Sequence, residues 1–82
     1  MDESVRMAVG ERTAKEVIAL LDSGRRVLID VEIVGTTHEI ALRQRDGVYY
    51  CDTPTTLYTH KTKAGIRECL EGEGYVAREG ER

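Results

Sequence analysis

Four side chains in this sequence carry the atoms most often used in metal binding and nucleophilic catalysis, namely His38, Cys51, His60 and Cys69. No two of them stand at the short intervals typical of zinc sites. A cysteine nucleophile also needs a base within hydrogen-bonding reach, and no motif here assembles such a pair. We therefore expect no metal, no cofactor and no catalytic activity, with both cysteines reduced and packed as small apolar residues. A hydrolase or nuclease acting through one of the histidines is the weaker alternative.

A first candidate binding site is a short polar stretch at the expected start of the second helix. It consists of Thr59, His60, Lys61, Thr62 and Lys63. The N-terminal end of a helix is already positive, so cations there are unfavourable, while free amides and hydroxyls suit a phosphate or carboxylate. The simpler interpretation is a solvated helix whose exposed charges have little effect. No glycine-rich loop accompanies the stretch, so the signal for an anion site has low specificity.

A second basic group contains Arg25, Arg26, Arg43 and Arg45. Strand pairing is expected to bring the start of one strand beside the end of the next, which would gather these arginines. Together with Lys61 and Lys63 they could contact a nucleic-acid backbone. The formal net charge of −3 weighs against this function. Charges at strand ends also serve simply to discourage aggregation.

The first expected helix covers residues 13 to 23. Thr13 and Glu16 form a capping box, in which each side chain accepts a hydrogen bond from the other residue's backbone amide. Apolar residues then recur with helical spacing at Val17, Ile18 and Leu21. Gly24 is suited to end the helix.

Three strands are expected between the two helices. Apolar and polar residues alternate from Val27 to Ile33, and Asp46-Gly47 is a strong hairpin signal before a third strand, VYYCD. That turn predicts that Leu42 pairs with Cys51. For the first hairpin we expect a turn at Gly35-Thr36, which would pair Val31 with Ile40 and Glu32 with Glu39. A four-residue loop pairing Asp30 with Arg43 is the alternative.

The chain beyond the third strand is expected to bend. Pro54 cannot donate to a sheet, so the third strand is predicted to be an edge strand. Residues 55–58 would continue as an extension that returns Leu57 to the core. A second helix, capped by Thr59 or Thr62, would then present Ile66, Cys69 and Leu70 to the sheet.

These elements predict an α+β fold: a three-stranded antiparallel meander with two helices in the order α-β-β-β-α. Alternation around Val5 and Met7 would suit a short extra N-terminal strand. Residues 1–82 are expected to form a single domain, with an ordered core at about 11–76 and loose termini.

The outer sheet face carries apolar residues among charges, which are Leu28, Val34, Ala41, Val48 and Tyr50. Such a mixed face favours cover by a second copy, so we expect a homodimer. The sequence has no apolar run long enough to cross a bilayer and no signal-peptide pattern, which predicts a cytoplasmic protein that does not bind membranes. The leading hypothesis is a small soluble, non-enzymatic binding or interaction domain that self-associates through its sheet. A nucleic-acid-binding module is the alternative.

Overall fold

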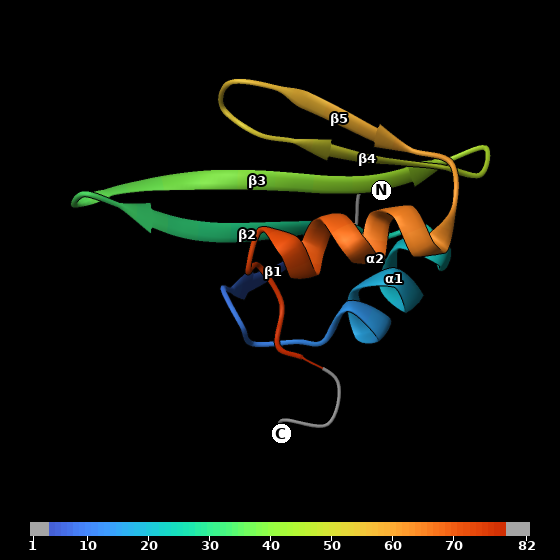
Figure 1. Cartoon of the computed structure of the whole chain (residues 1–82), viewed down its shortest axis with the longest axis horizontal. Coiled ribbons are helices and arrows are strands. Elements are labelled where there is room, and N and C mark those ends of the chain that lie inside the picture. Colours follow the sequence, from blue (N-terminus) through green and yellow to red (C-terminus); the bar gives the residue numbers. More distant parts are fainter. Residues whose placement is uncertain (1–3, 79–82) are drawn as a thin grey trace.

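The computed structural model describes residues 4–78, which form one mixed sheet with two helices on one of its faces (Figure 1). In chain order the elements are β1 (Ser4–Ala8), α1 (Ala14–Asp22), β2 (Arg26–Ile33), β3 (Thr36–Arg45), β4 (Val48–Asp52), β5 (Leu57–His60) and α2 (Lys63–Gly72). Of the termini that were expected to be loose, about 1–10 and 77–82, residues 1–3 and 79–82 lie outside the described residues, and Ser4–Ala8 forms β1.

The sheet has five strands in the spatial order β1-β2-β3-β4-β5. β1 pairs with β2 in parallel, and the remaining neighbours are antiparallel. The predicted three-stranded meander in the order α-β-β-β-α is therefore wrong, because a strand is added at each side of it. The N-terminal segment does form a strand, β1, whose Met7 is buried beside Ile29. Its partner lies across a helix in the sequence, and alternation within one short segment carries no information about such a pairing.

The second added strand, β5, follows a reverse turn at residues 53–56. The Thr53 amide donates to the carbonyl of Thr56 (2.9 Å), and the Thr53 hydroxyl both donates to that carbonyl (2.7 Å) and accepts from the Thr56 amide (3.0 Å). Because the chain reverses here, β4 is an interior strand, and the predicted edge strand at this position is wrong. Leu57 was expected in the core but pairs with Asp52 and is half exposed.

The β3–β4 hairpin has the predicted register, with Leu42 opposite Cys51, and both residues of the Asp46-Gly47 turn have positive φ. The β2–β3 hairpin does not. Its turn is Val34-Gly35, so Val31 faces His38, and both expected registers are wrong. A shift of two residues leaves every side chain on its expected face, which is why alternation could not reveal the error.

Val34 is a costly residue at this turn. Its φ is +48°, and its side chain is 99% exposed. A β-branched residue in the left-handed region destabilises the folded state by about 1–2 kcal/mol, whereas asparagine adopts this conformation more readily. We expect Val34→Asn to raise the free energy of unfolding by about 1 kcal/mol in urea denaturation. Val9→Asn, a control at another exposed valine, should leave stability nearly unchanged. A Val34→Asn variant no more stable than the wild type would contradict this explanation.

Helix α1 begins as predicted, with Thr13 as its N-cap and both capping-box hydrogen bonds present. Helix α2 is capped by Thr62, whose hydroxyl accepts from the Gly65 amide (2.9 Å), which decides between the two predicted caps.

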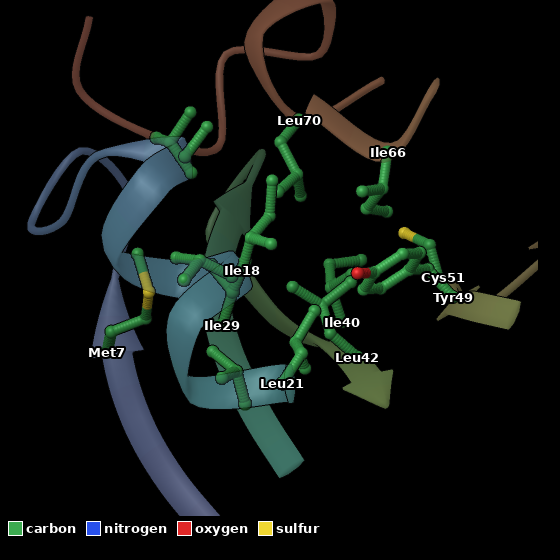
Figure 2. Close-up of a cluster of buried hydrophobic side chains, with 14 residues drawn as sticks. Met7, Ile18, Leu21, Ile29, Ile40, Leu42, Tyr49, Cys51, Ile66 and Leu70 are labelled. Atoms are coloured by element: carbon green, nitrogen blue, oxygen red, sulfur yellow. The ribbon is translucent and has the colours of Figure 1, made fainter. Parts of the chain in front are cut away.

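Both helices pack on the same sheet face and enclose one hydrophobic core. In Figure 2, the labelled side chains of the helices and of the sheet point toward one another. The fully buried residues with the largest side chains are Val17, Leu21, Val27, Ile29, Leu42, Cys51, Ile66 and Leu70. The opposite sheet face, here called the outer face, has no helix across it within residues 4–78. Neither described helix is long and apolar enough to span a bilayer.

Candidate functional site

The two predicted basic groups lie on opposite sides of the sheet. Strand alternation places Arg26, Arg43 and Arg45 on the outer face, because Val27 and Leu42 point into the core. Arg25 lies between α1 and β2, where its amide donates to the Leu20 carbonyl. The start of α2 lies on the helix side, so the arginines and Lys63 do not form one continuous basic surface (Figure 1).

The stretch at residues 59–63 is divided between these two sides. Thr59 pairs with Tyr50 and shares the outer face with it, whereas His60 pairs with the buried Tyr49. His60 Nε2 is buried and has no hydrogen-bond partner within residues 4–78. Lys61 is exposed between β5 and α2. Of the predicted anion site, only Lys61, Thr62, Lys63 and the His60 imidazole therefore remain together as candidates.

A carboxylate from the other helix already lies beside the start of α2. Asp22 Oδ2 is 3.4 Å from Lys63 Nζ, and Asp22 Oδ1 accepts a 2.6 Å hydrogen bond from the Tyr49 hydroxyl. This hydrogen bond, with Lys63 helping and partial burial opposing, lowers the pKa of Asp22 below its ordinary value. Burial and the same carboxylate raise the pKa of Tyr49 to about 12. Asp22 thus supplies negative charge where the sequence suggested an external anion.

Asp22 was not identified from the sequence as a partner for this site. The available signal was an acidic residue at the C-terminal end of α1, where the helix dipole disfavours it. A surface hollow nearby is lined by several charged side chains, Lys15, Asp22, Lys63 and Arg67. Arg67 pairs with Glu71 (3.2 Å) and Lys63 pairs with Asp22, so two of the three cationic side chains in this hollow already have carboxylate partners. Anion binding here stays a prediction.

The outer face is divided by charge along its strands. One end carries Arg26, Arg43 and Arg45, and the Arg43 guanidinium lies 4.7 Å from the centre of the Tyr50 ring. We call this the basic end. The other end carries Asp30, Glu32 and Glu39, and we call it the acidic end.

Arg6 of β1 joins the two hairpin strands at the acidic end. Its guanidinium contacts Asp30 (2.6 Å) and Glu39 (2.9 Å), which face each other across β2 and β3. The like-charge pair expected between Glu32 and Glu39 is absent, because Glu32 faces Thr37. Arg6 therefore compensates a like-charge pair that the observed register creates, and it was not identified from the sequence.

A groove of about 410 Å³ lies on the helix side, beyond the end of α2. It is lined by Val31, Ile33, His38, Ile40, Thr53, Pro54, Thr55, Tyr58, Glu73 and Tyr75. The β2–β3 hairpin extends past the helices (Figure 1), and this hairpin and the turn at residues 53–56 both contribute residues to the groove. Ile33 and Tyr58 remain 52% and 43% exposed there. Of the predicted metal and catalytic candidates, His38 lies in this groove.

Nearly the whole chain matches one known protein family. Residues 1–78 match a family of unknown function (DUF8001). The chain belongs to this family. No curated protein and no solved structure gives a significant match to this DUF8001 member.

The two cysteines of this DUF8001 domain are adjacent but poorly activated. Cys51 is fully buried, and burial, with Cys69 contributing, raises its pKa to about 12. Burial also raises the pKa of Cys69. Since the thiolate is the reactive form, both are weak nucleophiles near neutral pH. Within residues 4–78, no three His, Cys, Asp or Glu side chains are grouped to hold a metal ion.

Proposed function

We propose that this protein is a small, non-enzymatic interaction domain of the cytoplasm that forms a homodimer through the outer face of its sheet. The observation that carries the proposal is the position of the helices: both cover one face, and the outer face is left with half-buried apolar side chains. Leu28 and Ala41 are paired neighbours on this face, and the half-buried Tyr50 lies on it opposite Arg43. Covering apolar surface of this kind with a second layer lowers the free energy, because the surface is removed from water.

The charges of the outer face favour a second copy of the chain as that layer. The basic end and the acidic end lie at opposite ends of the same strands. When two copies stack face to face with their strands antiparallel, the basic end of each lies over the acidic end of the other. Both charge contacts then occur twice, as a two-fold dimer requires. Opposite charges also select this arrangement over the parallel one.

Charge reversal tests this arrangement directly. We expect Arg43→Glu and Glu39→Arg each to weaken dimerisation about tenfold or more, because each places like charges across the interface. A mixture of the two variants should regain association, since every reversed residue then meets a complementary partner. Sedimentation velocity of the single variants and of the equimolar mixture measures these results.

Lys15→Glu is the matched control, because it reverses a charge on α1, on the far side of the sheet. It should dimerise like the wild type. A wild-type protein that remains a monomer at high micromolar concentration would refute the proposal. So would a mixture that associates no better than either variant alone.

Contact with single-stranded nucleic acid is a second candidate function. The stacked Arg43 and Tyr50 side chains, with Thr59 alongside, resemble the basic and aromatic platforms on which bases stack. Binding of a labelled oligonucleotide that weakens with salt and is lost in Arg43→Glu would favour this function. Absence of binding at low salt would leave self-association as the function of this face.

A further inference from the structure

The groove beyond α2 combines aromatic and aliphatic side chains with the carboxylate of Glu73. Among residues 4–78, no lysine or arginine lines it, and Glu73 is the one acidic residue that does. No cation within residues 4–78 forms an ion pair with Glu73. The groove therefore presents negative charge without a partner among the described residues.

Two tyrosine rings lie in the same groove as this carboxylate. Tyr58 reaches it from β5 and Tyr75 from the segment after α2. All three residues line the groove. Burial raises the pKa of the Tyr75 phenol, and Cys51 and then Glu73 add to the increase. Aromatic faces attract cations through the ring quadrupole, and a nearby carboxylate adds to this attraction.

The shape and size of the groove favour a small ligand. Its volume of about 410 Å³ is within the usual range of small-molecule sites, about 300–1,000 Å³. Val31, Ile33 and Ile40 contribute an aliphatic part of the lining, called the aliphatic wall. A strongly hydrated inorganic ion would gain little from such a wall, whereas an ion carrying alkyl groups would bury them there.

We propose that this groove is a binding site for a small organic cation, an alkylated ammonium compound free in solution. The ammonium group lies between Tyr58, Tyr75 and Glu73, and its alkyl substituents contact the aliphatic wall. This site is on the helix side of the sheet and is independent of the proposed dimer face.

Choline and its uncharged carbon isostere, dimethylbutanol, separate charge recognition from simple apolar binding. Titration of the full-length protein, followed by two-dimensional NMR, should show saturable choline-dependent shifts at Val31, Ile33, Tyr58 and Tyr75. Dimethylbutanol should bind about fivefold more weakly or worse. Equal binding of the two compounds, or choline shifts located elsewhere, would overturn the proposal.

Glu73→Gln and Tyr58→Leu test the two sources of attraction separately. Each should weaken choline binding about threefold to tenfold, and neither residue is in the buried core. Glu68→Gln is the matched control, because it removes the same charge from the exposed surface of α2 outside the groove. Choline affinity should be unchanged in this control. Unchanged affinity in both Glu73→Gln and Tyr58→Leu would contradict the assigned site.

Discussion

Leu70→Ala is expected to lower the free energy of unfolding by about 2–5 kcal/mol. Leu70 is fully buried, and Ile66 is the other fully buried residue of α2. Truncation removes apolar contact and leaves a cavity between α2 and the sheet. A domain of this size has a total stability of about 4–12 kcal/mol, so the loss would be a large share of it.

Urea denaturation followed by circular dichroism measures this loss. Glu68→Ala, an exposed change on the same helix, should alter stability by less than about 0.5 kcal/mol. If Leu70→Ala cost under about 1 kcal/mol, the contact between α2 and the sheet would not be a main support of the fold.

Asp22→Ala is expected to cost about 1–3 kcal/mol of stability near neutral pH, because it leaves the hydroxyl of the buried Tyr49 without this acceptor. It also removes the ion pair with Lys63, whose exposed side chain adds little. Adding Tyr49→Phe to Asp22→Ala should recover part of the loss, since no unsatisfied hydroxyl then remains. Equal stability of the double and single variants would contradict the role assigned to this hydrogen bond.

The Asp22 carboxylate also makes the stability of the fold depend on pH, in a direction that can be predicted. The pKa of Asp22 is lower in the folded protein than its ordinary value, so folding favours its ionised form. Its contribution is fully present above the unfolded-state pKa of about 3.9 and is lost as the pH falls through the folded-state value. The stability difference between wild type and Asp22→Ala should therefore narrow in acid. A difference that stays constant down to about pH 2 would contradict this sign.

The two proposed sites occupy different faces and fail independently. Loss of dimerisation in Arg43→Glu should leave choline binding unchanged, because Arg43 is on the outer face and the groove is on the helix side. Conversely, Glu73→Gln should leave the dimer intact. Measuring both properties in both variants shows which of the two sites, if either, is present.

The sequence alone determined the features that depend on neighbours along the chain. The capping box of Thr13 and Glu16 and the turn at Asp46-Gly47 were predicted correctly, because each is formed within four residues. Alternation also assigned most core positions of β2, β3 and β4, since successive side chains of a strand point to opposite faces.

Only the tertiary structure decided which distant segments meet. The parallel pairing of β1 with β2 and the two-residue shift at Val34-Gly35 both preserve the local pattern, so that pattern could not distinguish them from the alternatives. The reversal that creates β5 instead moves Leu57 from its expected core position to the outer face. The candidate anion site at the start of α2 likewise depended on a long-range contact. The sequence showed a helix whose first turn carries disfavoured cations, and the fold brought Asp22 beside it from another helix. Long-range pairing is selected by the combined burial and charge of the whole sheet, which no single stretch of sequence contains.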